Sequence, residues 1–112
     1  MEYEVLINLE KDFMEVILDT NKFTLAFDIN PNTQSVRGIV VVYTNTDVER
    51  KVALYAINRL IKTMFQDVRY FENEDVPTML SFTGTTAIVD KEELIETFTE
   101  YLKNNISKHF LN

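Results

Sequence analysis

The segment from Thr46 to Gln66 constrains the fold most, because it has the pattern of a helix that is apolar over most of its circumference. At 100° per residue its apolar positions span roughly 260°, whereas a surface helix needs an apolar stripe only a little over about 100° wide. One small sheet cannot cover such a helix on both flanks. We therefore expect the spare face to contact a second chain or a bound partner.

This helix has a clear start and a predicted interface. Thr46-Asp47-Val48-Glu49 is a capping box, in which the side chains of Thr46 and Glu49 satisfy each other's orphan amides. We expect the helix to end at about Phe65 or Gln66. The predicted protein interface consists of apolar residues on the helix: Val48, Val52, Leu54, Tyr55, Ile61, Met64 and Phe65.

Alternating apolar residues predict an antiparallel sheet ahead of this helix. Phe23–Ile29 alternates strictly, which is typical of a strand with one buried face. Phe13–Asp19 alternates in the same way, and Val36–Thr44 is a β-branched run. Polar turn residues separate the three segments. Three consecutive antiparallel strands are the simplest interpretation.

The first ten residues fit two structures. Tyr3, Val5, Ile7 and Leu9 alternate as in a strand, but a helical stripe also runs through Val5, Leu6, Leu9, Phe13, Val16 and Ile17. We expect a short helix here, with a fourth strand as the alternative.

After the long helix, Val68–Phe71 is predicted as a short strand. Thr78–Phe82 and Thr86–Val89 flank Gly84 as a second hairpin or as one kinked strand. A final helix starts at Asp90 and has one apolar stripe, so it needs only one covering surface. The predicted fold is a single α+β domain, residues 1–112: a three-strand antiparallel meander, a long helix, further short strands, and a C-terminal helix packed on one sheet.

Composition narrows the classes of function. The chain has no cysteine, which excludes disulfides and thiolate metal sites, and only two glycines, which argues against a phosphate-binding loop. Eighteen acidic and eleven basic residues give a net charge of −7, which repels nucleic acid and anionic membranes and favours basic partners. The N-terminus carries acids where a signal peptide carries Lys or Arg, so a cytoplasmic location is expected.

No residue pattern predicts a catalytic, cofactor or metal site. His109 is the only histidine, and no nucleophile or orienting partner accompanies it, so a structural role at the helix end is the simpler interpretation. The acids at 72–75 lack the glycine turn and distal glutamate of an EF-hand loop. Glu92, Glu93, Glu96 and Glu100 suit the start of a helix electrostatically, and they also form a possible acidic docking surface for a basic partner.

The order of predicted elements, the acidity and the stretch from Ala53 to Asn58-Arg59-Leu60 in the long helix resemble the type III secretion chaperones and the related YbjN-like bacterial proteins. The resemblance covers about residues 13–111. It implies a small cytoplasmic dimer, built around the long helix or the adjacent sheet, that binds an extended segment of another protein.

Two functions follow as expectations. The first is a non-enzymatic protein-binding module, chaperone-like or adaptor-like, that acts as a homodimer. The second is a small acidic inhibitor or immunity protein that blocks a basic site on a nuclease or nucleic-acid-binding enzyme. One form of this hypothesis gives the protein a viral origin.

Overall fold

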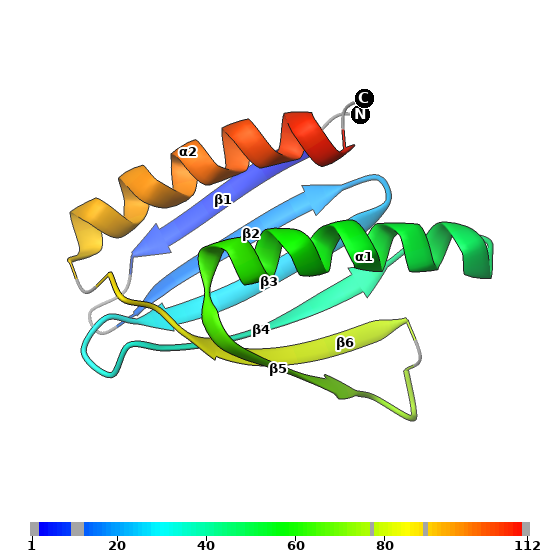
Figure 1. Ribbon diagram of the computed structural model, residues 1–112, viewed down its shortest axis with the longest axis horizontal. Coiled ribbons are helices and arrows are strands. Elements are labelled where there is room, and N and C mark those ends of the chain that lie inside the picture. Colours follow the sequence, from blue (N-terminus) through cyan, green and yellow to red (C-terminus); the bar gives the residue numbers. More distant parts are fainter. Residues whose placement is uncertain (1–2, 10–12, 77, 89, 111–112) are drawn as a thin grey trace.

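The protein folds as one antiparallel sheet of six strands with two helices on the same side of it (Figure 1). The computed structural model describes residues 3–9, 13–76, 78–88 and 90–110; side chains are described for 4–8, 13–76, 78–88, 90–101 and 103–104. In chain order the elements are β1 (Tyr3–Leu9), β2 (Met14–Thr20), β3 (Phe23–Asn30), β4 (Ser35–Val42), α1 (Asp47–Met64), β5 (Gln66–Glu72), β6 (Met79–Thr85) and α2 (Lys91–Phe110).

The strands lie in the order β1-β2-β3-β4-β6-β5. The first four form a continuous meander, since each pairs with the next in sequence. Helix α1 then carries the chain across the sheet to β5 at the far edge, and β6 returns to pair with β4. The predicted α+β class, the meander and the C-terminal helix are confirmed.

Two local predictions are wrong. Residues 3–9 form strand β1 and no helix, because pairing with β2 sets Val5 opposite Leu18 and Ile7 opposite Val16, on the side that faces the helices. The expected strand at Thr86–Val89 is absent from residues 86–88, and Val89 lies outside the described residues. Instead β6 runs through Gly84 as one strand, and beyond it the Thr86 amide donates to the carbonyl oxygen of Gln34.

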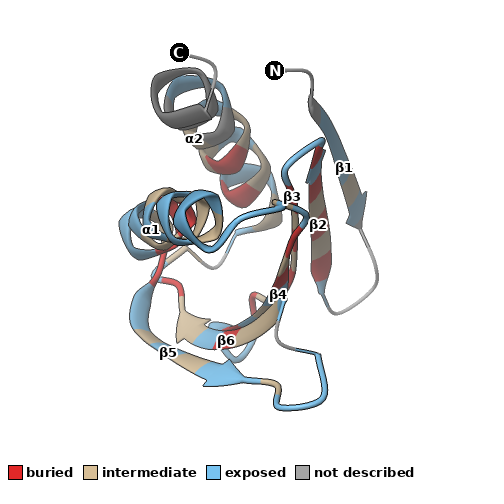
Figure 2. Cartoon of the chain, turned by 90° about the vertical axis from the view of Figure 1, so that its right-hand side faces the viewer, coloured by how far each residue is buried: buried red, intermediate tan, exposed pale blue. Residues whose placement is uncertain are grey.

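The core lies between the helices and the inner face of the sheet, which is the face that both helices cover (Figure 2). Every second residue of β2 and β3 is buried there, as the alternation predicted. At the centre, the ring of Phe27 lies 5.3 Å from the rings of both Phe65 and Phe98. Strand β3, the end of α1 and α2 therefore meet in one aromatic cluster, which holds the two helices against the same sheet.

The sheet curves so that β5 and β6 pass beneath α1 (Figure 2). This places Phe82 of β6 directly opposite Gly38 of β4. A Cβ atom on Gly38 would lie 2.4 Å from the Ala26 carbonyl oxygen and 2.7 Å from a ring carbon of Phe82. Glycine is required at this position because the Ala26 carbonyl oxygen and the Phe82 ring occupy the space that any side chain would need.

Helix α1 begins as predicted and ends one residue earlier. The Thr46 hydroxyl accepts a hydrogen bond from the Glu49 amide at 3.2 Å, which confirms Thr46 as the N-cap. The last helical residue is Met64, and Phe65 is the C-cap, whose amide still donates to the Ile61 carbonyl oxygen at 2.9 Å. Because Phe65 is extended, its side chain turns into the core.

Candidate protein-interaction surface on helix α1

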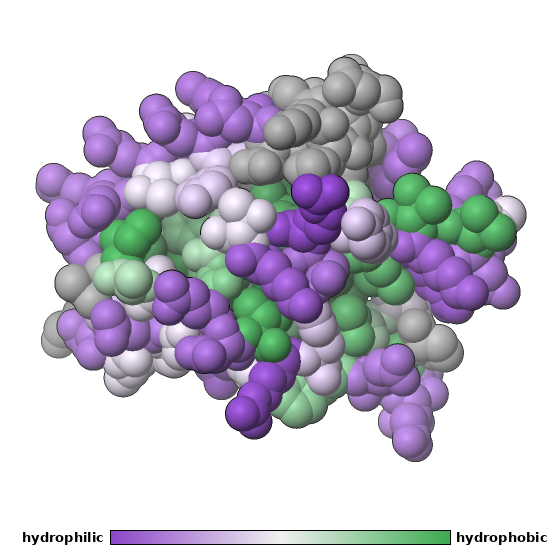
Figure 3. Space-filling model, in the orientation of Figure 1, coloured by the Kyte–Doolittle hydropathy of each residue, from purple (hydrophilic) through white to green (hydrophobic). Residues whose placement is uncertain are grey.

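Three large apolar side chains of α1 are exposed to solvent. The exposed fractions are 72% for Val48, 65% for Val52 and 65% for Tyr55. Their spacing of four and three residues puts them on one side of the helix. We call these three residues the α1 stripe. Figure 3 shows hydrophobic side chains at the end of α1 that projects beyond the sheet.

The stripe is exposed because it lies on the side of α1 that points away from the sheet, opposite the buried residues of the helix. The buried residues of the helix are Ile57, Leu60 and Ile61, all in its second half. The first half of the helix also extends past the end of β4 (Figure 1), and Leu54 is its apolar residue beside the strands. The exposed apolar surface of α1 therefore lies on the outward side of its first half.

The seven residues predicted as an interface divide into three groups. The α1 stripe is exposed, whereas Leu54 and Met64 are half-buried against the core. Ile61 is 0% exposed and Phe65 is 3% exposed, so these two belong to the core and cannot contact a partner in this conformation. The prediction was wrong for Ile61 and Phe65 because it assumed that only one small sheet covers the helix. The curved six-stranded sheet and α2 cover more of the helix than that.

A groove runs beside α1, between the helix and the strands beneath it. It consists of two adjoining hollows, of about 430 and 530 Å³, that share Leu54, Glu72 and Leu80. Its apolar lining comes from both layers: Leu54 of α1 and Leu80 of β6 are partly exposed, and Val40 and Ile57 are buried beneath them. We call this hollow the α1 groove. Sequence reasoning did not find it, since the strands that form its floor come from opposite sides of α1 in the chain.

The rims of the α1 groove are charged. Helix α1 contributes Arg50, Lys51 and Lys62, and the end of β5 and the following loop contribute Glu72 and Glu74. An apolar floor between rims of both signs suits an amphipathic protein segment. Arg50 is also tied to Asp47 by an ion pair of 3.3 Å on the same helix.

One partly buried polar contact joins the two sides of the groove. The Tyr70 hydroxyl on β5 donates to Asn58 Oδ1 on α1. Burial raises the pKa of Tyr70 to about 12, because desolvation disfavours the phenolate. A phenol that stays protonated at neutral pH holds the helix to the strand, and it is unsuited to act as a base.

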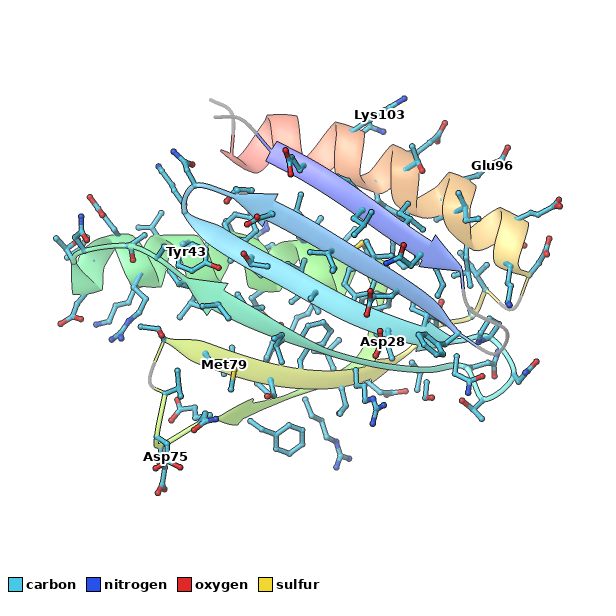
Figure 4. All side chains as sticks on the ribbon, turned by 180° about the vertical axis from the view of Figure 1, so that it is seen from behind. Asp28, Tyr43, Asp75, Met79, Glu96 and Lys103 are labelled. Carbon is cyan, nitrogen blue, oxygen red and sulfur yellow. The ribbon has the colours of Figure 1, made fainter. Side chains whose placement is uncertain are left out.

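The remaining sequence-predicted residues do not join this site. Glu92, Glu93, Glu96 and Glu100 are all exposed on α2, and Figure 4 shows Glu96 directed away from the sheet. His109 lies within α2, but its side chain lies outside the described residues. Among the described residues, no group of three or more His, Cys, Asp or Glu side chains is placed to hold a metal ion.

The chain matches no protein-family model, no curated protein and no solved structure. Within the described part of the chain, neither helix combines the length and hydrophobicity needed to cross a bilayer.

Proposed function

We propose that this protein is a non-enzymatic, cytoplasmic protein-binding module, chaperone-like or adaptor-like, that acts as a homodimer. The observation that carries the proposal is the exposed α1 stripe beside the α1 groove. Val48, Val52 and Tyr55 together present an exposed apolar surface on one side of the helix. The expected contact is with an amphipathic segment of another protein, whose apolar side chains occupy the stripe and groove.

The charges around the groove support a protein ligand. Lys51 and Lys62 on one rim and Glu72 and Glu74 on the other can pair with charges on both flanks of such a segment. Rim charges of this kind contribute more to orientation and association rate than to affinity. The resemblance to type III secretion chaperones, which implied an extended segment as ligand, is part of the same proposal.

Site-specific photocrosslinking tests the proposal. A photoreactive amino acid replaces Tyr55, whose exposure makes the replacement harmless to the fold, and the protein is illuminated in an extract of its source cells. We expect a discrete adduct with another protein that is lost when Val48 and Val52 are both changed to Ser. The matched control carries the photoreactive residue at the exposed Asp75. Equal labelling at both positions, or no adduct at residue 55, would contradict a binding role for α1.

A second candidate function is favoured by the exposure of all four α2 carboxylates, Glu92, Glu93, Glu96 and Glu100. These carboxylates are compatible with the acidic inhibitor, because an inhibitor of that kind would present them to a basic site on its target. Binding of that kind should weaken steeply with salt. Reversing Glu96 and Glu100 to Lys should abolish it, while the Val48 and Val52 changes should leave it intact. The reverse pattern would exclude the inhibitor.

A further inference from the structure

The outer face of the sheet, opposite the helices, carries an ordered pattern of side chains (Figure 4). The strand register aligns outward-pointing residues in rows that cross the sheet. One row is apolar except for a serine. From β1 to β5 in sheet order it reads Leu6, Ile17, Ala26, Ile39, Ser81 and Phe71. Leu6 is 53% exposed, Ile39 38% and Phe71 52%, so the row is open at both ends and at Ile39, and its other members are half-buried.

The charges beside this row are divided between the two halves of the face. One neighbouring row, from β1 to β5, reads Asn8, Glu15, Asp28, Arg37, Thr83 and Arg69. The other, from β1 to β6, reads Glu4, Asp19, Thr24, Val41 and Met79. In these two rows every acid lies on β1, β2 or β3, and both arginines lie on β4 and β5. The boundary between β3 and β4 therefore separates a negative half from a positive half.

Asp28 and Arg37 lie opposite each other at this boundary, Asp28 on β3 and Arg37 on β4. Within the described part of the chain, the structure gives one ion pair, and it is on α1. The facing charges at the centre of the outer face are thus left without a partner within ion-pair distance.

The pattern becomes complementary to itself under one symmetry operation. A two-fold axis parallel to the strands, between β3 and β4, would place each β3 on the β4 of a second copy, β2 on β6 and β1 on β5. Asp28 would then face the partner subunit's Arg37, and the apolar row would face itself. The strands of the two sheets would be aligned, which is a common geometry for packed sheets.

Side-chain sizes fit the same arrangement. Ile39 would lie over the partner's Ala26, and Ile17 over the partner's Ser81, so each isoleucine of the row meets a small residue. A hollow of about 510 Å³ at the centre of the face, lined by Ala26, Ile39 and Ser81 among others, gives the partner's Ile39 a place to insert. The residues at the two ends of the row, Leu6 and Phe71, would meet at the rim, where two outward-curving sheets diverge and bulk is needed.

The projected area of the whole outer face is below the area that a standard-size dimer interface buries on each partner. Six strands about 4.8 Å apart, each at least seven residues long at about 3.3 Å per residue, give roughly 550 Å² in projection. The accessible area of such a corrugated face exceeds its projection, and stable interfaces bury about 800 Å² on each partner.

We propose that the outer face of the sheet is the surface on which a second copy of this chain binds. The inference rests on the homodimer of the proposed function and assigns its interface. It leaves the α1 stripe and groove of both copies free for another protein, on the opposite sides of the dimer.

Sedimentation equilibrium of charge-reversed variants tests this interface. In Arg37→Asp, two aspartates face each other across the interface, and in Asp28→Arg two arginines do. We expect each variant alone to dimerise at least about tenfold more weakly than the unchanged protein. An equimolar mixture of the two should regain the dimer, because the heterodimer pairs aspartate with arginine at this contact. Recovery on mixing cannot be produced by variants that fail to fold.

The matched control is Val52→Ser on α1, which should dimerise normally. If Val52→Ser dissociates the dimer while Arg37→Asp does not, the copies meet on α1; the sheet interface is then wrong and the homodimer stands. If the unchanged protein is monomeric up to about 100 µM, both the sheet interface and the homodimer are wrong. That concentration is far above the dissociation constant expected for a standard-size interface. A monomer whose Arg37→Asp variant loses a crosslink to a different protein would assign this face to that protein and also overturn the inference.

Discussion

The hydroxyl of Tyr70 on β5 donates a hydrogen bond to Oδ1 of Asn58 on α1. This contact joins the helix to the edge strand of the sheet across the α1 groove, which is lined by both residues. Asn58 lies in the helix segment that suggested a chaperone resemblance. In the structure it serves to hold α1 over β5.

Tyr70→Phe should lower the free energy of unfolding by about 1 kcal/mol, because the amide oxygen of Asn58 loses its donor while partly buried. Urea denaturation measures the change. Tyr55→Phe is the matched control, since that ring is exposed and its hydroxyl makes no hydrogen bond among the described residues. If the free energy of unfolding falls by a similar amount in both variants, the hydrogen bond to Asn58 does not contribute to stability.

The raised pKa of Tyr70 gives a specific pH dependence of stability. The folded protein keeps this phenol protonated up to a pKa of about 12, whereas the unfolded chain releases the proton near 10.0. The contribution is complete below pH 10 and is lost as the pH rises through 12. We expect a loss of about 1 kcal/mol, below the full value of a two-unit shift because the ring is partly exposed. Denaturation from pH 9 to 12, compared with Tyr70→Phe, isolates the effect; parallel curves would contradict it.

Gly38→Ala should be strongly destabilising, by about 3 kcal/mol, because the added Cβ would lie 2.4 Å from a backbone oxygen that cannot move alone. Gly84→Ala is the comparison, since its nearest contact would be 3.2 Å. Thermal unfolding of the two variants ranks them. Equal melting temperatures would show that β4 can shift away from β3 without cost.

Phe65 and Val52 were predicted to belong to one interface, and the structure separates them. Phe65→Ala should cost about 3–5 kcal/mol, because it leaves a cavity between the rings of Phe27 and Phe98. Val52→Ala should change stability by less than about 0.5 kcal/mol, since the side chain is exposed. Chemical denaturation distinguishes them. A mild effect of Phe65→Ala would restore this residue to the interface.

Thr46→Ala should destabilise the protein by about 1 kcal/mol, because the Glu49 amide loses the hydroxyl that accepts its hydrogen bond. The exposed neighbour Asn45 provides the control substitution, Asn45→Ala. Urea denaturation measures the stability of both variants. If both are as stable as the unchanged protein, the Thr46 cap does not stabilise the helix.

The candidate site was only partly predictable from the sequence. The exposed residues Val48, Val52 and Tyr55 were found because they lie on the apolar helix, but the same reasoning also included the buried Ile61 and Phe65. The α1 groove was not found at all, since Leu80 and Tyr70 reach it from strands that follow the helix in the chain. Periodicity identifies an apolar face and carries no information on which distant segment covers it.

The sequence by itself determined the local structure where one period dominates. Strict alternation defined β2 and β3, the Thr46 capping box defined the start of α1, and a single stripe defined α2. Only the tertiary structure decided that residues 3–9 are a strand, that Phe65 is core, and that the charges of the outer face separate at the β3–β4 boundary. The physical reason is that these outcomes depend on strand register and layer packing. Those contacts form between residues far apart in the chain, where local propensity and spacing have no influence.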